Sequence, residues 1–96
     1  MTDTKTHLSR AERIEKLLKP QLSPHVFVLE DESARHIGHA GARPEGETHY
    51  RLRVVSDAFA GLSRVARQRL VYDALREEFD TGLHALSLDL KTSAEA

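Results

Sequence analysis

The chain has 96 residues, enough for one small domain, and it contains no cysteine. Disulfides, thiolate metal sites and cysteine nucleophiles are therefore excluded. The formal net charge of -1 at pH 7 argues against a nucleic-acid binder that works by bulk electrostatics. The sequence has no secretory signal, no apolar run of the roughly 20 residues that span a bilayer and no catalytic motif. We therefore expect a cytoplasmic protein that is neither an enzyme nor bound to membranes.

The predicted elements begin with a helix that follows a flexible tail over residues 1–8. The pattern Ser9-Arg10-Ala11-Glu12 is that of a capping box, in which the first and last side chains each bond to the backbone of the other. Pro20 and Pro24 are expected to end this helix, because proline lacks the backbone N–H that continues it.

Three strands are predicted from residue type and alternation. His25–Glu30 is rich in β-branched and aromatic residues, and both of its faces are expected to be partly covered. Thr48–Ser56 alternates apolar with polar side chains, and His84–Leu90 alternates with its leucines inward. With a short turn or helix and a long helix before the last strand, the sequence predicts an α+β domain. Helices are expected to cover one face of a three-stranded sheet.

The long helix is predicted to run from Arg64 to about Phe79, with Ser63 as its N-cap and Asp80-Thr81-Gly82 as its stop. Its expected buried face consists of Val65, Val71, Tyr72, Leu75 and Phe79. A narrower stripe predicts a second helix alongside and consists of Ala66, Leu70 and Ala74. Residues 92–96 are expected to form a flexible tail.

The loop Ser33–Glu47 is long for a connection between two strands, and loops of that length are usually functional or disordered. It contains His36 and His39, and neutral imidazole is a good ligand for zinc, copper, nickel and iron. Two ligands alone bind a metal weakly. Taken alone, the segment is therefore interpreted as a solvated loop with incidental histidines.

Two further histidines stand at strand starts. His84 follows a glycine turn, where a lone histidine is more often a hydrogen-bonded structural residue than a metal ligand. His49 is interpreted as structural, because strand alternation places it beside Arg51 and Arg53, away from the core.

The segment around the long helix resembles the signature of the BolA family. The residues that carry the resemblance are Phe59-x-Gly61-x-Ser63-Arg64-Val65-x-Arg67-x-Arg69-Leu70-Val71-Tyr72, Gly46-Glu47-Thr48-His49-Tyr50 and Leu83-His84-Ala85-Leu86. Gln68 departs from the family, which usually has histidine there, and is interpreted as a surface variation. The resemblance implies the order α-β-β-α-α-β, a KH-like fold, over residues 9–91.

The resemblance also implies a function. A BolA-like protein is expected to be a non-enzymatic partner of a monothiol glutaredoxin, with which it shares a two-iron two-sulfur cluster in iron-sulfur assembly, trafficking or iron sensing. His84 and His39, with His36 as the alternative to His39, would be the ligands from this chain. The glutaredoxin would give a cysteine, and glutathione the other thiolate. Outside that complex the fold needs no cofactor, and the apo protein is expected to be a monomer.

The alternative function is transcriptional regulation by DNA binding. The string Gly38-His39-Ala40-Gly41 fits the loop with which KH domains clamp single strands, but here it joins two strands and carries no basic residue. Arg64, Arg67 and Arg69 are the better candidates for a partner or nucleic-acid surface. The simpler interpretation of these arginines is a solvated helix face, with Arg69 paired to Asp73 one turn later.

Overall fold

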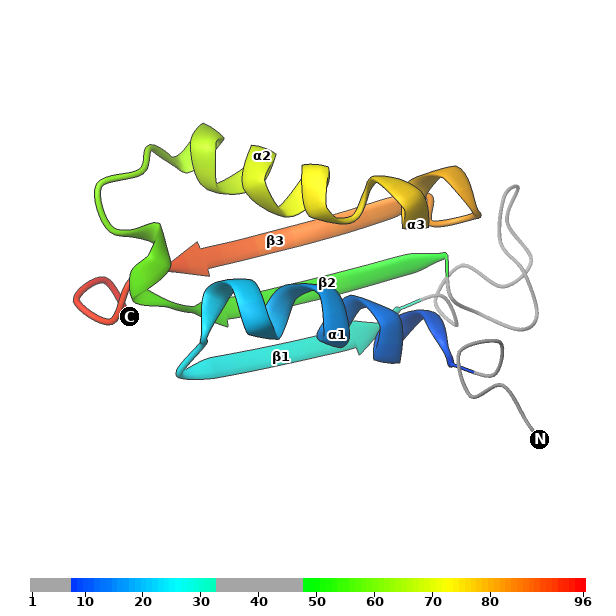
Figure 1. The fold of residues 1–96 in the computed structure, drawn as a ribbon, viewed down its shortest axis with the longest axis horizontal. Coiled ribbons are helices and arrows are strands. Elements are labelled where there is room, and N and C mark those ends of the chain that lie inside the picture. Colours follow the sequence, from blue (N-terminus) through cyan, green and yellow to red (C-terminus); the bar gives the residue numbers. More distant parts are fainter. Residues whose placement is uncertain (1–7, 33–47) are drawn as a thin grey trace.

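The computed structural model describes residues 8–32 and 48–96. The elements are α1 (Arg10–Leu22), β1 (Val26–Asp31), β2 (His49–Val55), the short 3-10 helix η3 (Asp57–Phe59), α2 (Arg64–Ala74), α3 (Arg76–Asp80) and β3 (Ala85–Lys91). Figure 1 shows α1 and α2 lying over the same face of the three-stranded sheet, so the predicted α+β architecture is confirmed. In the part of the chain that the structure describes, no helix is both long and apolar enough to cross a membrane.

The sheet has the strand order β1-β2-β3. β1 pairs with β2 in the antiparallel direction, and β2 pairs with β3 in the parallel direction. Parallel strands start at the same end of a sheet, and the register accordingly places His49 opposite Ala85. The chain segments that precede β2 and β3 therefore meet at one end of the sheet.

The hydrophobic core lies between the helices and one face of the sheet. Tyr50, Leu52 and Val54 of β2 are buried there, as their alternation predicted. On β1 the exposed fractions are 38% for Val26 and 42% for Val28, so the face of this strand that points away from the helices is only partly covered. Both helices pack on the opposite face, where the other apolar side chains of β1 join the core.

The first helix begins as predicted and ends later than predicted. The side chain of Ser9 accepts a hydrogen bond from the backbone of Glu12, whose carboxylate accepts one from the backbone of Ser9. The helix continues through Pro20 to Leu22, so Pro20 does not end it. Proline removes only one N–H near the end of the helix, and the last turn is anchored by burial of Leu18 and Leu22.

The long predicted helix is broken at Leu75. Its N-cap is confirmed, because the Ser63 side chain accepts a hydrogen bond from the Ala66 backbone. The break separates α2 from the short α3, which presents the carboxylate of Glu78 to Arg10 of α1 at 2.7 Å. Both side chains of this pair are buried. The break therefore accompanies an ion pair between helices that are distant in sequence.

The buried face of α2 differs in part from the prediction. Val71 and Leu75 are fully buried, but the exposed fractions are 55% for Val65 and 39% for Tyr72. Tyr72 lies at the edge of the sheet, where its hydroxyl donates to the Leu86 carbonyl at 3.1 Å. The narrower stripe is half-buried, and α1 and α2 contact each other, which confirms a helix alongside.

Residues 92–96 form a turn against the fold, in contrast to the expected flexible tail. Thr92 is buried, and its carbonyl accepts a hydrogen bond from the Glu95 backbone at 3.1 Å. The Glu95 carboxylate contacts Arg67 of α2. The turn is held by this ion pair, which local sequence patterns do not predict because its two residues lie far apart in the sequence.

Candidate functional site

His84 lies directly before β3, and its backbone is fixed on both sides. Leu83 is buried, and its N–H donates to the Glu78 carbonyl at 2.9 Å. The N–H groups of His84 and Ala85 both donate to the Thr48 carbonyl, at 2.8 and 3.1 Å. His84 itself is exposed. Within residues 8–32 and 48–96, its ring nitrogens form no hydrogen bond. A rigid backbone therefore presents an imidazole whose nitrogens are open to an external ligand.

His49 lies beside His84. The two rings are parallel within 7°, and their centroids are 6.0 Å apart. The Nδ1 atom of His49 lies 2.9 Å from the hydroxyl of Thr48, which is buried. His49 does lie on the side of β2 that faces away from the core, as predicted, but it also forms one wall of the His84 site.

The long loop is attached at this same end of the sheet. The chain leaves β1 at Glu32, whose N–H donates to the His49 carbonyl at 2.7 Å, and it re-enters the sheet at Thr48. His36 and His39, the loop ligands predicted from the sequence, lie outside the described residues. Among those described, no three histidine, aspartate or glutamate side chains are grouped in a way that could hold a metal ion.

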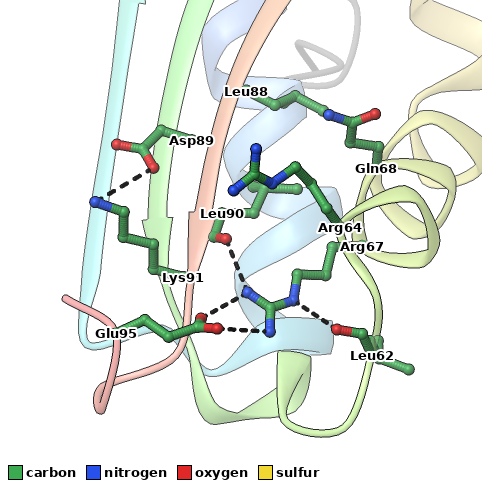
Figure 2. A pocket seen from close by; sticks show the side chains of 9 residues that line it. All are labelled: Leu62, Arg64, Arg67, Gln68, Leu88, Asp89, Leu90, Lys91 and Glu95. Atoms are coloured by element: carbon green, nitrogen blue, oxygen red, sulfur yellow. Dashed lines mark hydrogen bonds and ion pairs between the residues drawn. The ribbon is translucent and has the colours of Figure 1, made fainter.

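The three arginines expected to form a partner or nucleic-acid surface have different environments. Arg64 and Arg69 are exposed. The side chain of Arg67 is only 12% exposed and contacts its own chain, as Figure 2 shows. Asp73, the expected partner of Arg69, instead lies 3.7 Å from Arg76. The three arginines therefore do not act as one free basic stripe.

Two features of these regions were not predicted from the sequence. The neighbouring position of His49 depends on the parallel pairing of β2 with β3, and local alternation carries no information on that pairing. The Arg67 contacts depend on the return of residues 92–96 to α2. The one local sign of this return is a capping-like pattern from Thr92 to Glu95. In the structure the Glu95 carboxylate accepts a hydrogen bond from the Thr92 N–H at 2.7 Å.

A family model described as BolA-like protein matches residues 4–95 of the chain. The chain is 49% identical over 90 residues to the protein BOLA1, chloroplastic, of Arabidopsis thaliana, with 92% of this chain and 56% of that protein covered. It is 45% identical over 84 residues to the UV-induced protein uvi31 of Schizosaccharomyces pombe, with coverages of 84% and 82%. The chain thus spans about half the length of the first of these relatives.

Solved structures are similar over nearly the whole chain. The BolA domain of SufE1 from Arabidopsis thaliana superimposes with a TM-score of 0.82 at 49% identity, with 93% of this chain and 98% of that chain covered. BolA1 from the same plant gives a TM-score of 0.83 at 47% identity, with coverages of 93% and 97%. Because the names of some relatives refer to chloroplasts and mitochondria, the cytoplasmic location expected for this chain stays a prediction.

Proposed function

The chain belongs to the BolA-like protein family, as its motifs predicted, and on this premise we propose that it is a non-enzymatic partner of a monothiol glutaredoxin. In that complex it shares a two-iron two-sulfur cluster, and His84 is one of its ligands. The cluster serves iron-sulfur assembly, trafficking or iron sensing. The observation that carries this proposal is the exposed His84 imidazole on a backbone fixed by Leu83 and Thr48.

The residues present fit one half of such a cluster site. The chain has no cysteine, so it offers imidazoles, and both thiolates must come from the glutaredoxin and glutathione. A cluster with two imidazole and two thiolate ligands has a higher reduction potential than one with four thiolates. Imidazole binds metal only when it is deprotonated, so acidification should weaken the half of the site that this chain supplies.

The second ligand from this chain is assigned to His39, with His36 as the alternative. Both positions are within reach of His84, because the loop starts at Glu32 and ends at Thr48, beside His84. An extended chain spans up to about 3.3–3.6 Å per residue. The segments that join His36 and His39 to Thr48 are therefore long enough for either imidazole to approach His84. The choice between them rests on the Gly-His-Ala setting of His39.

The test is to co-express the chain with monothiol glutaredoxins and to purify the complexes without oxygen. We expect a coloured heterodimer with the visible absorption and circular dichroism of a histidine-ligated cluster. His84→Ala should abolish that spectrum. Loss of a residue that only supports a metal ligand lowers metal affinity by roughly tenfold or more, so loss of a ligand itself should lower cluster retention by more than roughly tenfold.

The matched control is His25→Ala. His25 is also an exposed histidine next to a strand, but its N–H donates to the Val55 carbonyl at the other end of the sheet. Its complex should keep the spectrum of the unmodified protein. If the His84→Ala complex keeps its spectrum and its cluster as well as the His25→Ala complex does, His84 is not a ligand.

A further inference from the structure

A second polar site lies at the far end of β3, away from His84. A cavity of about 670 Å³ separates the first half of α2 from the second half of β3, and Figure 2 shows the side chains that surround it. Its polar lining consists of three cationic and two anionic side chains together with Gln68. These charged residues are Arg64, Arg67, Lys91, Asp89 and Glu95.

Arg67 is held in place by its own chain before any external group arrives. Its Nε donates to the Leu62 carbonyl and its Nη1 to the Leu90 carbonyl, both at 3.1 Å. The ring centroid of Phe59 lies 5.9 Å from the guanidinium carbon, within the range of a cation–π contact. The guanidinium therefore presents a fixed pair of donors, which matches the two oxygens of a carboxylate.

Glu95 occupies these donors. Its Oε1 lies 2.6 Å from Nη1 of Arg67, and its Oε2 lies 3.1 Å from Nη2. The hydrogen bond from Arg67 is the main cause that lowers the pKa of Glu95 to about 2, and the Thr92 backbone adds to it. The Glu95 side chain is still 46% exposed, so its carboxylate lies at the open side of the cavity.

The cavity contains more positive charge than Glu95 neutralises. The guanidinium of Arg64 lies in the same space in Figure 2 and has no ion-pair partner in the described part of the chain. Lys91 and Asp89 extend away from Arg64 and Arg67 in Figure 2 and lie 3.9 Å apart with about half of each side chain exposed, so this weak pair adds little charge to the cavity. Without the Glu95 carboxylate, the guanidinium groups of Arg64 and Arg67 would lie together in the cavity with no carboxylate between them.

We propose that this cavity is a docking site for an acidic side chain of a partner peptide, and that Glu95 is an internal ligand that competes for it. The favoured occupant is a peptide, because the group that already fills the site is the side-chain carboxylate of Glu95, which belongs to a polypeptide segment. Leu62 and Leu88 add apolar walls for the residues that flank such a side chain. The site is independent of cluster binding, since it lies at the opposite end of β3 from His84.

The test uses the segment that the structure places in the site. The probe is the acetylated and amidated peptide Thr-Ser-Ala-Glu-Ala, titrated into isotope-labelled protein and followed by backbone amide and arginine Nε resonances. In the unmodified protein, only the fraction of molecules in which Glu95 has left Arg67 can bind the peptide, so the apparent affinity for the peptide is lowered to that fraction. Glu95→Gln should therefore bind the peptide at least about tenfold more tightly, with shifts around α2 and the end of β3.

Three comparisons keep the proposal falsifiable. Adding Arg64→Ala to the Glu95→Gln protein should remove most of the gain, whereas adding Arg69→Ala should not, because Arg69 is exposed on α2 outside the cavity. A peptide with glutamine in place of glutamate should not bind. The proposal is overturned if Glu95→Gln brings no gain, if Arg69→Ala costs as much as Arg64→Ala, or if inorganic phosphate binds better than the peptide.

Discussion

At the start of β3, the imidazole of His84 is exposed and its ring nitrogens have no hydrogen-bond partner among the described residues, while everything beneath it is fixed. At the end of β3, Arg67 is nearly buried, and its donors are taken by two carbonyls and by Glu95. The first end leaves an imidazole open to solvent, as the proposed cluster site requires. The second end can bind an external carboxylate at Arg67 only if that carboxylate displaces Glu95.

The difference follows from how each side chain is supported. His84 is held through its backbone, so its side chain contributes little to the fold and is available for function. Arg67 is held through its side chain, which therefore contributes to the fold and cannot be removed without loss. A variant at either end tests this contrast directly.

The largest expected effect is that of Glu78→Ala, which removes the buried ion pair near the His84 end and keeps the backbone carbonyl that Leu83 bonds. Glu78 pairs with Arg10 in a buried ion pair, and its carbonyl also accepts the hydrogen bonds of Leu83 and Arg10. Removal of one partner leaves an uncompensated buried charge, so we expect a loss of about 3–5 kcal/mol in the free energy of unfolding. Urea denaturation measures it.

Arg76→Ala is the matched control for that variant. Arg76 forms an ion pair with Asp73 in which both side chains are largely exposed, so its loss should change the free energy of unfolding by less than about 1 kcal/mol. Equal losses in the two variants would show that the buried pair does not support the His84 end.

A smaller loss is expected from Leu83→Ala, which leaves a cavity directly before His84. Leu83 is 3% exposed, and truncation of a buried leucine costs about 2–5 kcal/mol, with the low end expected at this edge of the core. Leu17→Ala, at a leucine that is 38% exposed, should cost less than half as much. If Leu83→Ala unfolds at the same urea concentration as Leu17→Ala, the backbone of His84 is not anchored by Leu83.

The sequence predicted those parts of the fold that depend on neighbouring residues. Both N-caps, Ser9 and Ser63, are confirmed, since each needs only an amide three residues ahead. The inward face of β2 is also confirmed, since it depends only on the alternation of side chains along one strand. The break at Leu75 and the exposed position of Tyr72 were not predicted, because each accompanies a contact with a distant element, Arg10 in one case and the Leu86 carbonyl in the other.

The two ends of β3 were predictable to different degrees. His84 was found by its motif, and its exposure agrees with the ligand role assigned to it, which stays a prediction. Arg67 belonged to the family signature around the long helix and was expected on a partner or nucleic-acid surface. Its environment depends on Glu95, far along the chain, and no periodicity within α2 reports a residue that returns from outside the helix.

The smallest effect is expected for the Glu95 contact, and it should depend on pH. Its folded-state pKa is lowered from 4.5 to about 2, mainly by the hydrogen bond from Arg67. A lowered pKa means that the stabilisation is complete above pH 4.5 and is lost as the pH falls towards 2. The difference in stability between the unmodified protein and Glu95→Gln should thus be constant near neutral pH and should shrink below pH 4.5.

Urea denaturation of both proteins across this pH range measures that difference. The comparison with Glu95→Gln is needed because the pKa of Asp57 is also lowered, chiefly by the Ser93 backbone N–H, so both proteins lose stability in acid for a second reason. That second loss cancels in the difference. A difference that stays constant down to pH 2 would mean that the Glu95 carboxylate is not held by Arg67 in solution. The end of β3 would then be as open to an external ligand as the start.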